Sequence, residues 1–296
     1  MITAFYGLLL LSSVCSSYKI VIFAPDISNS QVGWNKRVSE TLAKAGHDVT
    51  VVLVQTIEDP DKDLSFSTEV TVMPVNASSG FTVDEFEGFM KDSVFGDLPL
   101  WDSRHRTHME KFMGSLIEGC KLTVQNKTFM KWLTDEKFDI AFAHMYHTCP
   151  IALIHAAKIP TWIWLLSGQL MDTVGTLVGV PTFPSYVPPL MMESIDEMTF
   201  YERTKSFIGY NLGNILYPRM VVNKETAMCG MRKHWDPNFP DILDLASKCP
   251  LVMANSNELY EFPRPTLAKV VNIGGLGVEH KDAKPLKDVS APQQVA

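Results

Sequence analysis

The sequence has few cysteines and little positive charge. Only 5 of its 296 residues are cysteine, which is too sparse for a disulfide-rich scaffold. Its 26 lysines and arginines are outnumbered by 33 aspartates and glutamates, which gives a formal net charge of −7. No cluster of basic residues offsets this balance, so the composition argues against nucleic acid as the main partner.

Two glycine motifs of common enzyme classes are also missing. A dinucleotide-dependent dehydrogenase needs G-x-G-x-x-G between its first strand and helix, and residues 26–33 lack this pattern. Residues 274–277 are rich in glycine, but they precede a polar segment and are more typical of a turn. A serine hydrolase would carry G-x-S-x-G, which does not occur in the sequence.

Long apolar runs are confined to the amino terminus. Residues 2–14 are almost wholly apolar, and small residues follow up to Ser17. We therefore predict that residues 1–17 are a signal peptide cleaved after Ser17, which directs the chain into the secretory pathway. A transmembrane anchor is the alternative, but the run is short for a span of about 20 residues. The expected location is the lumen of the endoplasmic reticulum or the outside of the cell.

Two N-glycosylation sequons agree with a secretory route. They begin at Asn76 and Asn126, and each is followed two residues later by Ser or Thr. Four cysteines remain after Ser17. Among them, Cys229 and Cys249 are a candidate disulfide pair, with free buried thiols as an equal alternative.

Alternating strand and helix patterns predict an α/β fold with a doubly wound, mainly parallel sheet. Residues 18–24 and 48–54 are apolar and strand-like, and residues 32–45 between them repeat apolar side chains every four positions. A helix that joins two strands directly makes the strands parallel. Further strands are expected at 69–74, 139–143, 159–165, 251–255 and 269–273, and further helices at 109–120, 129–133, 200–233 and 240–247, with a proline-rich loop at 179–192.

Chemistry is expected where two of these strands end. His144, His147 and Cys149 follow the strand at 139–143, and a polar turn at 25–31 follows the first strand. Ligands of open parallel sheets bind beyond the carboxyl ends of the strands. A metal site is an alternative use of these three side chains, but they are crowded and no second ligand cluster is evident, which favours ordinary polar turn residues.

Two tryptophans occupy the strand that follows. Trp162 and Trp164 alternate with aliphatic residues, which predicts that at least one of them packs in the core. The other is available as the floor of an apolar pocket.

Several segments, taken in order, resemble the UDP-glucuronosyltransferase family. They are residues 41–52 (TLAKAGHDVTVV), 252–265 (VMANSNELYEFPRP) and 271–277 (VNIGGLG), while 161–168 and 184–189 resemble its nematode branch. The resemblance implies a GT-B architecture, in which residues 18–278 are the acceptor-binding, amino-terminal domain. Residues 279–296 are then a linker, and the domain that binds UDP-glucuronate, together with the membrane anchor of full-length relatives, is absent from the sequence.

The resemblance also implies an inverting transfer, in which a histidine held by an aspartate deprotonates a small lipophilic acceptor. Ser30-Gln31 stands where the family has Ser-His, and His144 stands where it has the acid. We hypothesise that His144 is the base and Gln31 orients it or the acceptor, with Ser30, His147 and Trp164 binding the acceptor. A divergent copy with little or no transferase chemistry is the alternative.

No resident cofactor or metal is expected. Because the donor-binding half is missing, this polypeptide alone is expected to be inactive. A function of a different class is a non-catalytic secreted module, which binds lipophilic molecules or pairs with a full-length relative or a second copy of itself.

Overall fold

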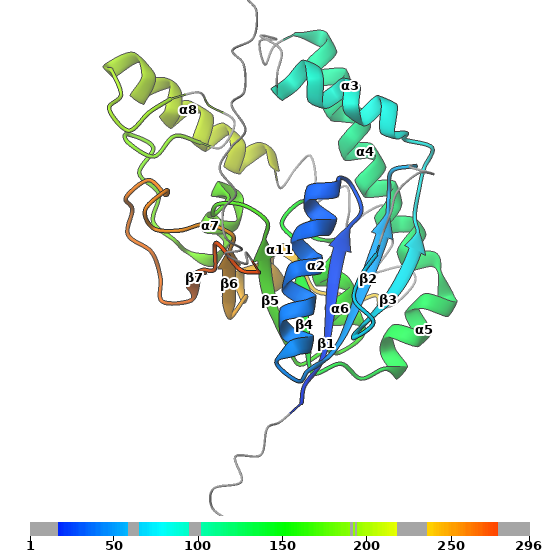
Figure 1. Ribbon diagram of the computed structural model, residues 1–296. Helices are drawn as coiled ribbons and strands as arrows, with labels where there is room; N and C mark the ends of the chain where they lie inside the picture. The colour runs from blue at the N-terminus through cyan, green and yellow to red at the C-terminus, as the bar shows by residue number, and fades with distance from the viewer. Residues whose placement is uncertain are drawn as a thin grey trace, which may run out of the picture.

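The structure is a computed structural model that describes residues 17–58, 65–94, 102–189, 192, 194–217 and 236–277. Seven strands form one sheet in the order β3-β2-β1-β4-β5-β6-β7, and each neighbouring pair is parallel. The order reverses between β1 and β4, because the chain runs outward from β1 to β3 and then returns to β4. The predicted doubly wound, parallel α/β fold is therefore confirmed (Figure 1).

The strands and helices have the following bounds. The strands are β1 Lys19–Pro25, β2 Asp48–Gln55, β3 Val70–Asn76, β4 Ile140–Ala143, β5 Thr161–Leu166, β6 Leu251–Ala254 and β7 Val270–Asn272. The helices are α2 Asn29–Lys44, α3 Val83–Val94, α4 Ser103–Gln125, α5 Lys127–Asp135, α6 Cys149–Ala156, α7 Asp172–Val178, α8 Phe200–Tyr217 and α11 Ile242–Ser247.

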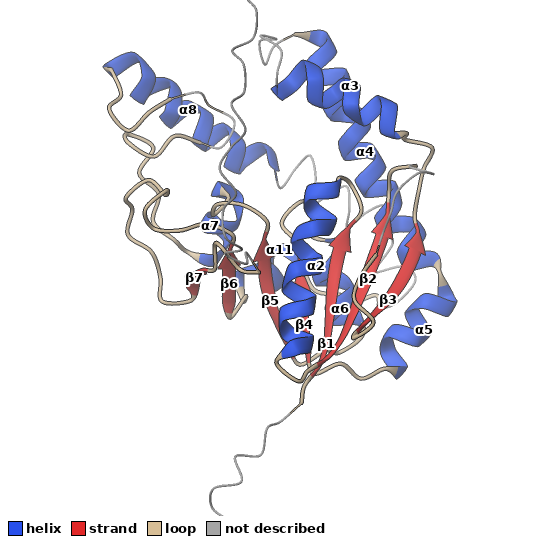
Figure 2. Ribbon diagram, in the orientation of Figure 1, coloured by secondary structure: helices blue, strands red, loops and turns tan. Residues whose placement is uncertain are grey.

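The central strands are buried on both faces, which explains their nearly continuous apolar runs. Ile20 and Ile22 of β1 pack with Trp34 of α2 on one face. Val21 and Phe23, which alternate with them, face a second core formed with α4, α5, α6, α7 and α11. Figure 2 shows α2 in front of the sheet and α6 and α11 behind it. Because successive side chains of a strand point to opposite faces of the sheet, helices must cover both faces to bury these apolar residues.

Helix α2 begins earlier than the sequence pattern predicts. The carbonyl of Ser28 accepts hydrogen bonds from the backbone N–H groups of Gln31 and Val32, both at 3.1 Å. Ser30 and Gln31 therefore lie in the first turn of the helix, not in the preceding turn. The predicted end is confirmed, because Gly46 follows the helix with a φ of 91°, a conformation that favours glycine.

Of the two alternatives predicted for Cys249, the disulfide with Cys229 is wrong and the free buried thiol is confirmed. A disulfide joins Cys120 to Cys149 with a Cα–Cα distance of 5.9 Å, and Cys249 is a buried free thiol. Cys120 of α4 and Cys149 at the start of α6 lie in the same core, a proximity that no local sequence pattern encodes. Cys229 lies outside the described residues.

Other predictions also fall outside the described residues. They are residues 1–16 of the predicted signal peptide, the linker at 279–296 and the second part of the helical region at 200–233. Among the described residues, no helix is both long enough and apolar enough to cross a bilayer.

Candidate functional site

The turns that follow β1 and β4 meet at the point where the strand order reverses. Ile22 of β1 is in register with Phe142 of β4, so the ends of the two strands lie at the same edge of the sheet. Such a reversal opens a crevice beyond the strand ends, where doubly wound proteins bind ligands. The segment at 26–31 and the segment at 144–148 both border this switch point, as the sequence predicts.

His144 is held at the end of β4 by two hydrogen bonds. Its Nδ1 accepts from the backbone N–H of Tyr146 at 3.2 Å. Its backbone carbonyl accepts from the indole N–H of Trp164 at 3.1 Å. The residue is 5% exposed, so the ring and its backbone are fixed at the rim of the core.

His147 lies against His144 in the same turn. The ring centroids are 4.5 Å apart and the ring planes are inclined by 74°. The Nδ1 atom of His147 accepts from the backbone N–H of Cys149 at 3.3 Å. Burial and the adjacent His147 place the pKa of His144 well below its usual value, and burial lowers the pKa of His147 to about 4. Both rings are therefore neutral at pH 7.

The same hydrogen bonds fix the tautomer of each ring. A neutral imidazole has one N–H donor and one acceptor nitrogen. In His144 and His147 the acceptor is Nδ1, because each receives a backbone N–H. The proton of each ring is therefore on Nε2.

Gln31 and Ser30 reach this edge from the first turn of α2. Gln31 is partly buried and Ser30 is exposed. The Gln31 carbonyl accepts from the side-chain amide of Asn35 at 2.8 Å, and the Ser30 hydroxyl lies 3.0 Å from that of Ser28. Within the part of the chain that the structure describes, no hydrogen bond connects Gln31 to His144. The sheet brings their segments together without joining the two side chains.

Two residues of the site are not singled out by the sequence analysis. Asp26 directly follows β1 and is 1% exposed, and its backbone N–H donates to the carbonyl of Val54 at 2.9 Å. Tyr146 is half-buried, and its hydroxyl lies 3.4 Å from that of Ser167. Burial raises the pKa of Tyr146, so this group remains a phenol. The sequence signal of Asp26 is a polar side chain immediately after a buried strand, and that of Tyr146 is its place in the polar turn that follows β4.

An aromatic cluster borders the same edge beneath α3 and α4. Its buried members follow β1, β2 and β3 or lie on the two helices: Ile27, Ile57, Phe81, Phe89, Phe112 and Leu116. Phe89 and Phe112 stack with centroids 5.5 Å apart. Tyr146 packs against this cluster, which places apolar surface directly beside the polar turn of His144.

Trp164 lies in the core. It is 2% exposed, and its indole N–H is bonded to the His144 carbonyl. Trp162 is the more accessible of the two indoles, and their centroids are 5.6 Å apart. Trp164 thus helps to fix the backbone of His144 through this hydrogen bond. Direct contact between Trp164 and an acceptor stays a prediction.

One of the three candidate metal ligands, Cys149, is not available to a metal ion. The sulfur of Cys149 is committed to the disulfide with Cys120, so it is not available as a thiolate. Across the described ranges, no group of three or more His, Cys, Asp and Glu side chains has the arrangement of a metal site.

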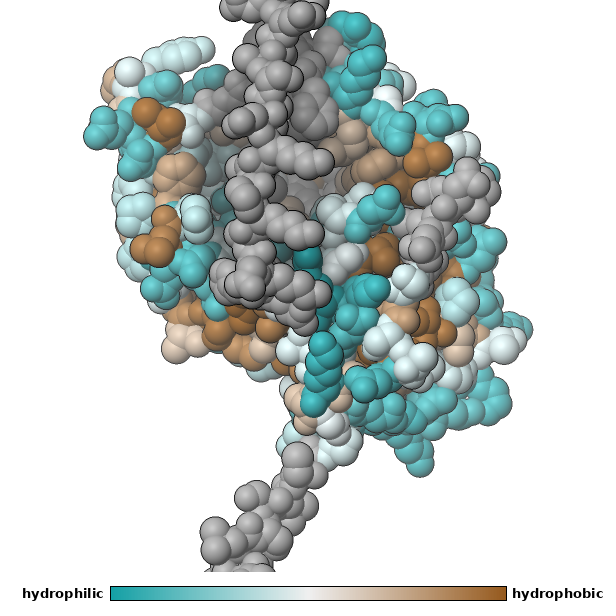
Figure 3. Space-filling model, viewed as in Figure 1, coloured by the Kyte–Doolittle hydropathy of each residue, from teal (hydrophilic) through white to brown (hydrophobic). Residues whose placement is uncertain are grey.

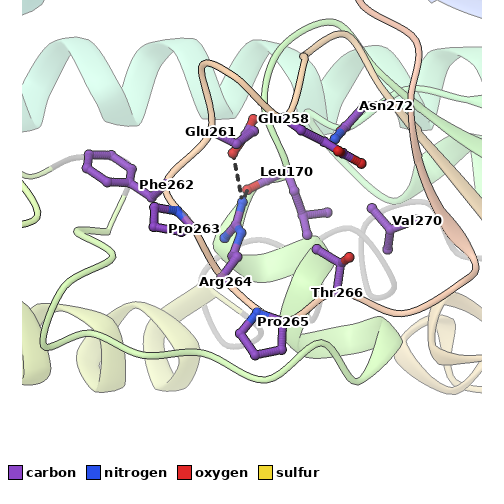
Figure 4. Close-up of a pocket in the computed structure, with 10 residues that line it drawn as sticks. All are labelled: Leu170, Glu258, Glu261, Phe262, Pro263, Arg264, Pro265, Thr266, Val270 and Asn272. Atoms are coloured by element: carbon purple, nitrogen blue, oxygen red, sulfur yellow. Dashed lines mark hydrogen bonds and ion pairs between the residues drawn. The ribbon is translucent and has the colours of Figure 1, made fainter.

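A separate cavity of about 490 Å³ lies beside β6 and β7, away from the switch point (Figure 4). Arg264 stands in it and donates to the carbonyl of Leu170 and to the carboxylate of Glu261, each at 3.2 Å. Because the guanidinium is engaged by groups of the chain, it ties the loop after β6 to the segment after β5. The residues around this cavity therefore have a structural role, because they hold these two segments together.

Comparisons with known proteins agree with one another on a family. A family model described as UDP-glucoronosyl and UDP-glucosyl transferase matches residues 19–292. The putative UDP-glucuronosyltransferase ugt-48 of Caenorhabditis elegans is 27% identical over 267 residues, which is 90% of this chain and 50% of that protein. Human UDP-glucuronosyltransferase 2B7 is 29% identical over 285 residues, with the same two shares of 90% and 50%.

The chain spans about half the length of the curated relatives it matches. Among solved structures, the calicheamicin glycosyltransferase CalG4 is similar over 88% of this chain and 53% of its own, with 12% identity and a TM-score of 0.43.

Proposed function

Since this chain belongs to the UDP-glucoronosyl and UDP-glucosyl transferase family, we propose that it takes part in transferring a sugar from a UDP-sugar to a small lipophilic acceptor. The sugar is glucuronic acid or a hexose. The observation that carries this proposal is the family match over residues 19–292. We propose further that residues 18–278 form the acceptor-binding, amino-terminal domain of a GT-B enzyme.

The surroundings of the switch point support an acceptor site there. The aromatic cluster beneath α3 and α4 supplies apolar surface, and the turn of His144 and His147 supplies polar atoms beside it. A mostly apolar site with a few fixed polar groups is the usual composition of a small-molecule pocket. In this proposal the acceptor's ring packs toward Tyr146, and its reacting oxygen faces His144 and Gln31.

The chemistry in this proposal is a direct displacement. The acceptor oxygen attacks the anomeric carbon and gives up its proton to a base, the bond from that carbon to UDP breaks, and UDP leaves with the electron pair. The described residues orient the acceptor oxygen. Binding of the UDP-sugar is assigned to sequence outside residues 18–278, so this region alone is expected to bind acceptor without turning it over.

Calorimetric titration of the chain with 1-naphthol tests the proposal. We expect saturable binding in the absence of any UDP-sugar, and loss of most of that binding in Tyr146→Ala. Lys131→Ala is a matched control, since Lys131 is an exposed residue of α5 that pairs with Asp135. Absence of saturable binding by the wild-type chain would contradict acceptor recognition by this region.

A second candidate is a non-catalytic module that binds lipophilic molecules or pairs with a full-length relative or a second copy. The exposed apolar side chains of α8 favour it, because large exposed apolar patches mark sites of association. Phe200 is 87% exposed and Phe207 is 60% exposed. Figure 3 shows apolar side chains on the surface where α8 lies. Turnover of UDP-glucuronate by the native protein would exclude this candidate.

We also propose that the protein enters the secretory pathway. The predicted signal peptide at 1–17 and the two sequons support this location. Asn76 and Asn126 are both exposed, as an acceptor of glycosylation must be.

A further inference from the structure

We propose that the cavity beside β6 and β7 is a binding site for a small organic amine, which the carboxylate of Glu261 holds as an ammonium ion. The amine carries a compact apolar body of the size of one aromatic ring. The cavity lies away from the switch point, so the inference does not depend on the proposed function.

The first observation is a buried carboxylate oxygen without a hydrogen-bond donor. The side chain of Glu261 is 13% exposed, and its Oε2 atom accepts from Nη2 of Arg264 at 3.2 Å. Its Oε1 atom is buried and accepts no hydrogen bond from the part of the chain that the structure describes. Because buried polar atoms are normally paired, a water, an ion or a ligand is expected to be the partner of this oxygen.

The second observation is the size of the cavity that Glu261 lines. Its volume of about 490 Å³ lies within the range of about 300–1,000 Å³ that is usual for small-molecule sites. Its walls come from the loop after β6, from β7 and from Leu170 in the segment after β5 (Figure 4). The cavity is therefore large enough for an organic molecule and not only for a water.

The third observation is the sign of the charge around the cavity. The ionised side chains among its described lining residues are the carboxylates of Glu258 and Glu261 and the guanidinium of Arg264. Two carboxylates and one guanidinium leave negative charge in excess. Arg264 already donates to the Leu170 carbonyl and to Glu261, so its charge is offset within the chain. A positively charged ligand is therefore favoured over an anion.

The donor atoms and the apolar walls favour an organic cation over a metal ion. Among the residues that the structure describes, no third His, Cys, Asp or Glu joins the two carboxylates in the arrangement of a metal site. Leu170, Phe262 and Val270 line the same cavity. An ammonium group supplies N–H donors for Oε1 of Glu261, and an apolar body attached to it packs against these three side chains.

Methyl NMR of the wild-type chain at pH 7.5 tests the inference with three probes: benzylamine, benzyl alcohol and benzoate. The probes share a phenyl ring and differ in the charge of the attached group. We expect benzylamine to bind at least tenfold more tightly than either of the other two. Its binding should shift the methyl signals of Leu170 and Val270, which line the cavity from different segments.

Two variants and a matched control test the role of the carboxylates. Glu261→Gln removes the charge of the buried acceptor and should weaken benzylamine binding at least tenfold. Glu258→Gln removes the charge of an exposed side chain and should weaken binding without disturbing a buried group. Glu110→Gln should leave binding unchanged, because Glu110 is an exposed residue of α4 outside the cavity.

Three results would overturn the inference. They are equal binding of benzylamine and benzyl alcohol, benzylamine binding that neither Glu261→Gln nor Glu258→Gln weakens, and no saturable binding of benzylamine, which would leave a water as the partner of Oε1. The comparison of probes uses the wild-type chain, so it does not depend on the folding of a variant. Binding of 1-naphthol should be unchanged in Glu258→Gln, which separates this site from the acceptor site.

Discussion

The disulfide between Cys120 and Cys149 joins the last turns of α4 to the first residue of α6. Cys149 also donates its backbone N–H to Nδ1 of His147. The covalent link therefore anchors the residue that fixes the ring of His147. It connects α4, which contributes residues to the aromatic cluster, to the turn that holds both histidines.

Reduction of this disulfide should lower stability. The bridge spans 29 residues of sequence, and closing a loop of this size typically contributes about 2–4 kcal/mol to the free energy of unfolding. We expect reductant to lower the urea midpoint of the wild-type chain but not that of the Cys120→Ser, Cys149→Ser double variant. Cys249→Ser is the control, since this free thiol should not change the effect of reductant. An equal midpoint with and without reductant would contradict the assignment.

Acid should destabilise the protein through its buried histidines. The pKa of His147 is about 4 in the folded protein, whereas an unfolded histidine titrates near 6.5. The unfolded chain therefore binds the proton first, so this contribution to stability is complete above about pH 6.5 and is lost as the pH falls toward 4. The loss for one ring is roughly 3 kcal/mol over this window, at about 1.4 kcal/mol per pH unit.

Urea unfolding between pH 7.5 and pH 4.5 measures this dependence. The free energy of unfolding should fall less steeply with decreasing pH in His147→Gln than in the wild type. Part of the pH dependence should remain in this variant, because the pKa of His144 is also lowered. The exposed His155→Gln variant should retain the full slope. Parallel curves for the wild type and His147→Gln would show that His147 is not buried in its neutral form.

Two glycines of α4 should respond in opposite directions to alanine. A Cβ on Gly119 would lie 2.7 Å from Cγ2 of Thr56 and 3.1 Å from the carbonyl oxygen of Ala77, whereas one on Gly114 meets nothing within 4 Å. We expect Gly119→Ala to lower the free energy of unfolding by about 1–3 kcal/mol through overpacking. Gly114→Ala should raise it by up to about 1 kcal/mol, because alanine is the better helix former. Similar effects of both changes would contradict the close approach of α4 to the sheet.

Both sequons should carry glycans when the chain is made in a secretory host. Asn76 is exposed at the end of β3 and Asn126 is exposed at the start of α5. Treatment with an N-glycanase should remove two glycans, and Asn76→Gln and Asn126→Gln should each remove one. Asn126→Gln should also cost about 1 kcal/mol, because the Asn126 side chain accepts the backbone N–H of Phe129 at the helix start. An unmodified chain would contradict the proposed location.

Much of the sheet can be predicted from local pattern. The segments at 18–24 and 48–54 are apolar and β-branched, so strand propensity and burial agree there, and both strands are found within one residue of prediction. The placement of His144 at a strand end follows from the same pattern. Helix α7 is not assigned by the sequence analysis, because its sequence DTVGTLV combines β-branched residues with glycine, which are weak helix formers.

The features that could not be predicted from the sequence depend on contacts that local sequence patterns do not encode. The partner of Cys149 lies 29 residues away, and only the fold, which brings both cysteines into one core, selects it over other cysteines. The role of His144 depends on which nitrogen the Tyr146 N–H reaches. Composition and spacing identify an imidazole at the site, but the local backbone geometry decides whether that imidazole donates or accepts.

The central claim is that acceptors bind beyond the ends of β1 and β4, and photoaffinity labelling of the chain tests it most directly. A naphthyl azide would be crosslinked to the protein with and without excess 1-naphthol, and the labelled peptides would be mapped by mass spectrometry. We expect labelling that 1-naphthol displaces in residues 26–31 and 144–148. Displaceable labelling confined to the cavity beside β6 and β7, or to α8, would contradict the account.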